Sequence, residues 1–410
     1  MKKIIVSFVA LFVVAGMVSF TIPAPTLAVA QGQGSDNLTH VIISFDKPVG
    51  HSEQALVRAH GGEIKYSYSI VDAIAAALPA GAIEGLSRNP HITAVEMDGP
   101  VYAADIELDN SWGVKRIGAG TVHVSGNTGA AVKIGIIDSG INYTHPDLDG
   151  VYAGGYDFVQ SDNDPMDVYG HGTHVAGTAC AEDNGFGVVG VAPNCALYSL
   201  RVLNDDGVGS WSVTIAALDW AVTHGMQVVN LSLGSSRNPG TAVKTAFDNA
   251  EAKGIVIVAA AGNSGNKAGK GDNIIYPAKY ASVIAVGATD LTNKRASFSS
   301  TGSTLELMAP GVSVLSTWND STSYLDPQPI CLDSVCYYKY GSGTSMASPH
   351  VAGAAALVIA SGIVTDTNGN SRINDEVRAK LDSTATDLGT TGKDAQYGYG
   401  LVNAFNAVQP

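Results

Sequence analysis

The chain has 410 residues, 45% of them hydrophobic and 15% charged, so it can bury a large core and is long enough for more than one domain. This composition excludes an intrinsically disordered protein. The net charge of -14 argues against binding to nucleic acid, whose phosphates need clustered lysine and arginine, and fits a soluble secreted protein with cation sites.

The N-terminus has the three parts of a secretory signal peptide, which we predict over residues 1–30. Lys2 and Lys3 precede an apolar run at residues 4–20, and Ala28-Val29-Ala30 supplies the small residues of a cleavage site. An uncleaved membrane anchor is the alternative, but the run is short for a bilayer. No later segment is long and apolar enough to cross a membrane, so we expect a secreted, extracellular protein.

Residues 31–104 predict a small α+β domain, with its ordered part at about 38–102. Hydrophobic periodicity predicts these elements in order: strand 40–45, helix 53–60, extended chain 66–78, helix 82–87 and strand 92–96. This order predicts a split βαβ, ferredoxin-like fold.

Residues 105–410 predict a second, larger domain of the α/β class. Near-continuous apolar runs predict strands at 132–137, 196–203, 228–233, 255–260 and 283–286, and helices are predicted at 171–181, 212–224, 241–253 and 345–361. Apolar strands that alternate with helices indicate a parallel twisted sheet with helices on both faces. Ligands then bind beyond the carboxyl ends of the strands, where Asp138 lies.

Three short motifs supply an aspartate, a histidine and a serine in that chain order: Asp138-Ser139-Gly140, Gly170-His171-Gly172 and Gly343-Thr344-Ser345. A serine hydroxyl is a poor nucleophile, so it needs an imidazole to take its proton and a third group to orient that imidazole. We therefore predict Ser345 as nucleophile, His171 as general base and then acid, and Asp138 as the group that stabilises the imidazolium. The order excludes the chymotrypsin-like proteases and the α/β-hydrolases.

These motifs resemble those of the subtilisin-like serine proteases, and the resemblance extends from about Trp112 to the C-terminus. It is carried by residues 136–140, 171–178, 260–263 and 343–353, in the family's order. The resemblance implies a serine endopeptidase that hydrolyses peptide bonds through an acyl-enzyme. It also implies that residues 31–104 are a propeptide that assists folding and inhibits the enzyme until it is removed, with the cut at Ala103 or Ala104. An independent ferredoxin-like module is the alternative.

The resemblance also implies roles for residues around the triad. Asn263 would bind the oxyanion together with the backbone N–H of Ser345, and Pro349 would stand in the first turn of the helix that Ser345 opens, where a missing N–H costs little. An extended peptide would lie as a strand between two edges, which allows broad specificity. The substrate-binding residues implied are Ser232, Leu233, Gly234, Gly209, Trp211, Ala260, Ala261, Gly262 and Ile275.

Two departures from the familiar family members stand out. Ile275 falls where many relatives have a small residue at the floor of the main specificity pocket. The stretch at 319–338 is longer than in the simplest members and leads into the loop before Ser345.

The resemblance implies one calcium site, and the sequence suggests two more. At the first, Asp147 and the side chain of Asn184 would join the backbone carbonyls of Glu182, Phe186 and Val188, all hard oxygen donors, although the family's N-terminal ligand has no counterpart. A second ion could lie at Asp162, Asp164 and Asp167. The loop at 366–372 has oxygen ligands at alternate positions, but a solvated turn explains it equally well. His174 is expected to be structural and not a zinc ligand.

Four cysteines allow three pairings. We favour Cys331 with Cys336, which closes a short turn, and Cys180 with Cys195, which closes the loop between them; free thiols are the alternative.

Other functions fit the sequence less well. A narrow-specificity processing protease of the kexin group typically has an acidic residue where Ser139 stands and does not share His174 or Met346. A non-catalytic secreted scaffold does not explain an intact triad with Asn263. We expect a monomer that acts on proteins and peptides, has its own propeptide as inhibitor, and binds no nucleic acid.

Overall fold

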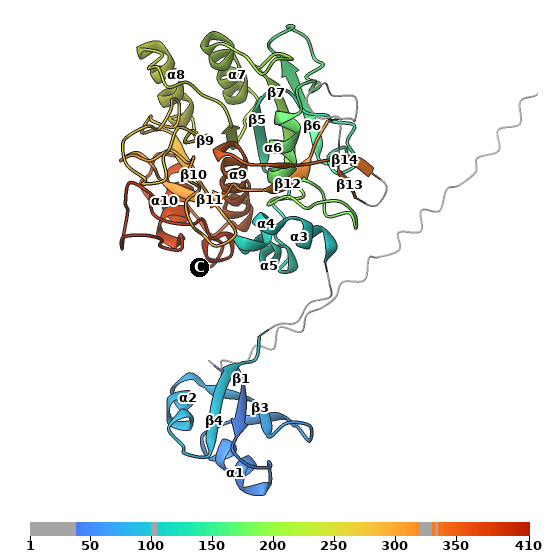
Figure 1. Ribbon diagram of the computed structural model, residues 1–410, viewed down its shortest axis with the longest axis vertical. Coiled ribbons are helices and arrows are strands. Elements are labelled where there is room, and N and C mark those ends of the chain that lie inside the picture. Colours follow the sequence, from blue (N-terminus) through green and yellow to red (C-terminus); the bar gives the residue numbers. More distant parts are fainter. Residues whose placement is uncertain (1–37, 100–104, 320–329, 333–334) are drawn as a thin grey trace, which may run out of the picture. The chain divides into compact units, whose positions relative to one another are not determined.

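The computed structural model describes residues 38–99, 105–319, 330–332 and 335–410 (Figure 1). The chain forms two compact units, Met1–Ala103 and Ala104–Pro410. The predicted signal peptide and the predicted cut at Ala103 or Ala104 lie outside the described residues. None of the helices within the described ranges is long and apolar enough to cross a membrane.

The first unit is a four-stranded antiparallel sheet whose strand order is β2-β3-β1-β4. Its elements are β1 (Leu38–Phe45), α1 (His51–Ala59), β2 (Glu63–Ser67), β3 (Ala73–Pro79), α2 (Ala80–Ser87) and β4 (Ile92–Met97). Val57 of α1 and Leu86 of α2 pack on Ile43 and Ile74 of the sheet, as the ferredoxin-like prediction requires. The run predicted at 66–78 is two strands, because the chain turns between Ser67 and Ala73 into a hairpin.

The second unit is built on a seven-stranded parallel sheet in the order β11-β10-β9-β8-β5-β7-β6, which confirms the predicted fold class. The strands are β5 (Lys133–Asp138), β6 (Tyr152–Asp157), β7 (Ala196–Arg201), β8 (Val228–Leu231), β9 (Val256–Ala260), β10 (Ile284–Thr289) and β11 (Leu307–Pro310). The two strands that periodicity missed are at the edges. Strand β6 holds two glycines and little apolar surface, and β11 ends at Pro310, whose missing N–H is tolerated at an edge.

Successive residues of the central strands point to opposite cores. Val228 and Val258 pack with α6 (His171–Cys180) and α9 (Thr344–Ser361), whereas Val229 and Ile257 pack with α7 (Trp211–Thr223) and α8 (Thr241–Glu251). Burial on both faces explains why these strands are continuous apolar runs in the sequence. Figure 1 shows α7 and α8 close together and α9 against the sheet.

The remaining elements of this unit lie outside the main sheet. They are α3 (Ile106–Asn110), α4 (Trp112–Arg116), α5 (Ala119–Val124), α10 (Asn374–Thr384), α11 (Ala404–Ala407) and a small sheet of β12 (Val314–Thr317), β14 (Val335–Gly341) and β13 (Ile330–Leu332). Both favoured disulfides are present, Cys180–Cys195 and Cys331–Cys336, so the free-thiol alternative is wrong.

Strand β5 lies between β7 and β8, so the chain adds β6 and β7 on one side of β5 and β8 to β11 on the other. At such a switch point the loops that leave neighbouring strands run apart, and a crevice opens at the carboxyl ends of the strands. Asp138, Ser232 and Asn263 all end or follow strands at this edge.

Candidate active site

Asp138 and His171 meet at the carboxyl end of β5. The Asp138 side chain is fully buried, and His171, the first residue of α6, keeps 22% of its side chain exposed. His171 Nδ1 donates to Asp138 Oδ1 at 2.8 Å, and the Ser139 N–H donates to the same oxygen at 2.7 Å. Since the carboxylate accepts the Nδ1 proton, Nε2 is left as the basic nitrogen.

Electrostatics favour the protonated form of His171. Burial alone lowers its pKa, but the charge and hydrogen bond of Asp138 and the charge of Asp167 outweigh burial, so the pKa is raised above its ordinary value. An imidazolium that forms during proton transfer is therefore stabilised.

Ser345 lies beside Ser232, which follows β8. Ser345 Oγ donates to the Ser232 carbonyl at 3.2 Å, and Ser232 Oγ donates to the Ser345 carbonyl at 2.8 Å. Ser232, the hydrogen-bond partner of Ser345, lines the same pocket as His171.

The sequence interpretation of Pro349 was wrong about its position. Helix α9 begins at Thr344, so Pro349 lies in the second turn, where an N–H would donate to the Ser345 carbonyl. The Ser232 hydroxyl donates to that carbonyl instead. The proline therefore leaves the Ser345 carbonyl free to accept a hydrogen bond that joins α9 to the end of β8.

Asn263 has its side-chain amide oriented by Thr344. The Asn263 Oδ1 accepts from the Thr344 N–H at 2.9 Å and from Thr344 Oγ1 at 3.0 Å, so the amide nitrogen points the other way. A methyl group built on Gly343 would lie 3.3 Å from Asn263 Nδ2 and 3.6 Å from the Ser345 amide nitrogen. The Asn263 amide and the Ser345 N–H therefore lie on either side of the same small space. That space is empty because residue 343 is a glycine and has no side chain.

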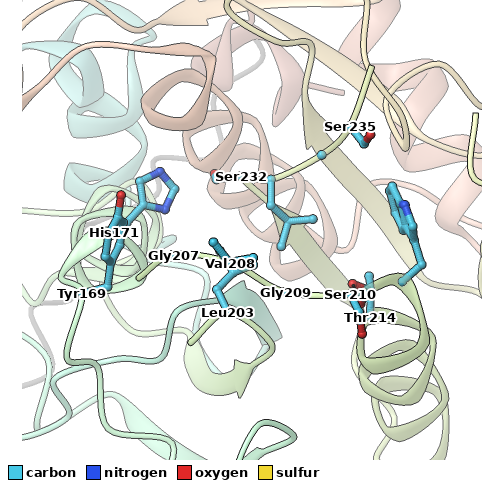
Figure 2. Close-up of a pocket in the computed structure, with 13 residues that line it drawn as sticks. Tyr169, His171, Leu203, Gly207, Val208, Gly209, Ser210, Thr214, Ser232 and Ser235 are labelled. Carbon is cyan, nitrogen blue, oxygen red and sulfur yellow. Dashed lines mark hydrogen bonds between the residues drawn. The ribbon is translucent and has the colours of Figure 1, made fainter. Parts of the chain in front are cut away.

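A pocket runs along the cleft from His171 (Figure 2). Of the predicted substrate-binding residues, Gly209, Trp211, Ser232, Leu233 and Gly234 line it. Sequence reasoning missed Tyr169, Leu203 and Thr214, which also line it. Their only signal was position: Tyr169 is two residues before His171, Leu203 follows β7, and Thr214 is one helical turn after Trp211.

Ile275 lies between Gly234 and Gly262, two of the predicted substrate-binding residues. A methyl group on Gly234 would lie 2.7 Å from Ile275 Cδ1, and one on Gly262 would lie 2.9 Å from Ile275 Cγ2. The Ile275 N–H donates to the Ala261 carbonyl, and Ala260 and Ala261 are buried. The isoleucine side chain therefore occupies the space that glycines on either side leave.

The loop at 182–188 closes on Asp147. The Glu182 N–H donates to the Asp147 carbonyl at 2.9 Å, and the Val188 N–H donates to Asp147 Oδ2 at 3.1 Å. Burial raises the pKa of Asp147 to about 6, and the charge of Glu182 adds to the rise. Asn184 Nδ2 lies 3.4 Å from Asp147 Oδ1, and half a turn of that amide would place its oxygen there. The carbonyls of Phe186 and Val188 belong to the same loop.

Glu107 of α3 is a second carboxylate at this loop that sequence reasoning missed. Its oxygens accept from the N–H groups of Asn184 and Gly185 at 3.0 and 2.9 Å. Burial raises the pKa of Glu107 to about 7. Within the described ranges no three side chains of histidine, cysteine, aspartate or glutamate form a metal-binding group. A calcium site whose ligands are mostly backbone carbonyls and a side-chain amide would contain too few of these side chains to form such a group.

The other two suggested cation sites are not supported. Asp162 accepts the N–H of Asp164, Asp164 accepts the hydroxyl of Tyr143, and the carboxylate of Asp167 is filled by four donors, so the three carboxylates do not converge. In the loop at 366–372, the Asp366 carboxylate accepts backbone N–H groups, as in a turn.

His174 is buried and holds α6 to the small sheet. Its Nε2 lies 3.1 Å from the carbonyls of both Val314 and Lys339, and burial lowers its pKa to about 3. A neutral ring that donates to two backbone carbonyls agrees with the structural role expected from the sequence.

Comparison with known proteins identifies the class. The model of the subtilase family matches residues 129–400, and the chain belongs to this family. Subtilisin J of Geobacillus stearothermophilus is 40% identical over 395 residues, which cover 95% of this chain and 96% of the relative. Subtilisin E of Bacillus subtilis is 40% identical over 387 residues (93% of each chain), and an alkaline protease of Alkalihalobacillus alcalophilus is 42% identical over 342 residues (83% and 80%). The protein is therefore a serine endopeptidase.

Proposed function

We propose that this protein is a secreted endopeptidase with a Ser345–His171–Asp138 triad, stabilised by calcium and made as a precursor that processes itself. The hydrogen bond between His171 and Asp138, beside a serine whose N–H and the Asn263 amide flank one point, carries the proposal.

The chemistry proceeds through an acyl-enzyme. His171 Nε2 takes the Ser345 proton as Oγ attacks the scissile carbonyl, and Asp138 stabilises the imidazolium. The Asn263 amide and the Ser345 N–H bind the oxyanion. His171 then protonates the leaving amine, and water, activated by the same imidazole, hydrolyses the ester.

A serine-directed organophosphate tests the nucleophile. We expect labelling of the parent and of Ser361→Ala, a matched control at the far end of α9, and none of Ser345→Ala. Loss of the nucleophile should lower kcat by about 10⁶-fold, the figure known for subtilisin. Equal labelling of Ser345→Ala would refute the assignment.

In this proposal, Ile275 determines which substrate residue is preferred immediately before the scissile bond. Because its side chain lies between Gly234 and Gly262, we expect medium apolar residues such as leucine or methionine to be preferred over phenylalanine, tyrosine and tryptophan. One methylene of misfit is worth about 1–3 kcal/mol, a preference and not an exclusion. Ile275→Gly should raise the relative kcat/KM for phenylalanine in a peptide library; an unchanged profile would contradict this.

A calcium ion at the 182–188 loop would be held by Asp147, the Asn184 side-chain oxygen and the carbonyls of Glu182, Phe186 and Val188. The donors fit a hard cation: all are oxygens, and the buried Asp147 has another carboxylate, Glu182, as its charged neighbour. The ion would supply positive charge that stabilises the folded loop.

The first unit is proposed as the propeptide, preceded by the signal peptide. The segment at 101–104 joins it to the catalytic unit, and a tethered substrate-like segment has a high effective concentration at the cleft. Exported Ser345→Ala protein should keep the first unit attached, whereas the parent should yield two fragments and then only the larger one. Processing of Ser345→Ala at the same site and rate, in a host without other proteases, would contradict self-cleavage.

A further inference from the structure

Asp167 is a buried carboxylate with no role in the proposed chemistry. It is 4% exposed and lies four residues before His171. Its Oδ1 accepts from Ser139 Oγ at 3.0 Å and from the Gly170 N–H at 2.8 Å. Its Oδ2 accepts from the Thr173 N–H at 2.9 Å and from Thr173 Oγ1 at 2.6 Å. Each oxygen thus holds one hydroxyl and one backbone N–H.

These donors flank the two partners of the catalytic hydrogen bond. Gly170 and Thr173 stand on either side of His171 in the chain, and Ser139 directly follows Asp138. The Ser139 hydroxyl, while donating to Asp167, accepts the Gly172 N–H at 2.9 Å. One carboxylate therefore connects the end of β5 to the first turn of α6.

We propose that Asp167 is a positioning residue. Its hydrogen bonds link the end of β5 to the first turn of α6 and so set the geometry between Asp138 and His171. This inference rests on the proposed triad. Asp167 acts through Ser139, Gly170 and Thr173 and does not touch the substrate.

The charge of Asp167 acts on the pKa of His171, which a change in packing alone would not shift in the same way. The titratable groups that act on His171 are Asp138 and Asp167, whose negative charges raise its pKa, and His174, with which it interacts. Burial raises the pKa of Asp167 itself to about 6, so this carboxylate is charged mainly above that pH. Removal of its charge should therefore lower the pKa of His171 in the range where Asp167 is ionised. The acid limb of kcat/KM should move to lower pH, because His171 must be neutral to act as base.

Asp167→Asn is the decisive variant. Whichever way the new amide points, its NH₂ group faces one backbone N–H, of Gly170 or of Thr173, which cannot reverse its polarity as a hydroxyl can. Asp164→Asn is the matched control, since Asp164 accepts from the exposed Tyr143 hydroxyl and lies outside this cluster.

The enzymes are compared after titration of active sites, with kcat and KM measured from pH 5 to 9. For Asp167→Asn we expect kcat per site to fall about 10- to 100-fold, the scale of a small misplacement of catalytic groups. We expect an unchanged KM and an acid limb at lower pH, with Asp164→Asn equal to the parent. An unchanged kcat per site and an unmoved limb would overturn the inference while the parent's activity upholds the proposed function. An inactive parent would overturn both.

Ser139→Ala keeps the inference testable if Asp167→Asn does not fold. It removes the hydroxyl that bridges Asp167 and the Gly172 N–H but leaves the Asp167 charge. A fall in kcat of about 10-fold with unchanged KM and an unmoved acid limb is expected. A kcat equal to that of the parent would overturn the inference.

Discussion

The two ends of α6 both hold buried carboxylates, yet the carboxylates are satisfied differently. At the N-terminal end, Asp167 accepts four hydrogen bonds, all from neighbouring backbone N–H groups and hydroxyls. At the C-terminal end, Asp147 Oδ2 accepts from Val188 and Tyr338, while Oδ1 faces an amide that can present either of its atoms. The difference indicates that unused acceptor capacity, and not the mere presence of a carboxylate, is what makes Asp147 the better candidate for a cation ligand.

The largest effect should come from the N-terminal end. Asp138→Asn leaves His171 Nδ1 facing an amide, which destabilises the productive tautomer and the imidazolium. We expect kcat to fall about 10⁴-fold, the size known for this change in other serine proteases. The melting temperature should change far less than kcat. Retention of a tenth or more of the parent's kcat would remove Asp138 from the mechanism.

At the C-terminal end of α6 we expect substitutions to change the free energy of unfolding and not kcat. Cys180–Cys195 joins the end of α6 to the start of β7, with a sequence separation of 15, and closes the chain around the 182–188 loop. Replacing both cysteines by alanine should lower the unfolding free energy by about 3 kcal/mol. The same change at Cys331 and Cys336, separated by 5, should cost about 2 kcal/mol. A larger loss at the shorter loop would contradict the ranking.

Chelation should affect the same end of the helix. An ion bound only by the folded state, at a free concentration about 100 times its Kd, stabilises that state by about 2.7 kcal/mol. A chelator should therefore lower the melting temperature and open the 182–188 loop to proteolysis. Asp147→Ala should remove most of that sensitivity, and Asp162→Asn should retain it. Identical melting curves with chelator and with excess calcium would argue against the site.

The smallest effect concerns the hydrogen bond between Asp147 and β14, the strand that precedes Ser345. Tyr338 of β14 is buried, and its hydroxyl donates to Asp147 Oδ2 at 3.0 Å. Tyr338→Phe should lower the unfolding free energy by about 1 kcal/mol in urea titrations, the net worth of a typical hydrogen bond. Tyr340→Phe, an exposed neighbour, serves as control. Indistinguishable midpoints for the two variants would show that the contact contributes nothing.

Sequence periodicity predicted the central strands and the helices around them, because those strands are buried on both faces. It missed β6, which holds two glycines and little buried apolar surface, and β11, which is only four residues long and ends in a proline. It also ran β2 and β3 together, because nothing in the apolar pattern marks the hairpin turn between them.

The sequence by itself determined the fold class and the order of the aspartate, histidine and serine motifs, since these depend on local patterns. It favoured the cysteine pairing that the structure has, but the pairing was decided only by the fold. Only the tertiary structure decided what the buried carboxylates do. Asp167 looked like a cation ligand beside Asp162 and Asp164, and Glu107 carried no signal at all. The reason is physical: the donors that saturate a carboxylate can come from residues far apart in the chain, as Ser139 does for Asp167 and Asn184 for Glu107, and only folding brings them together.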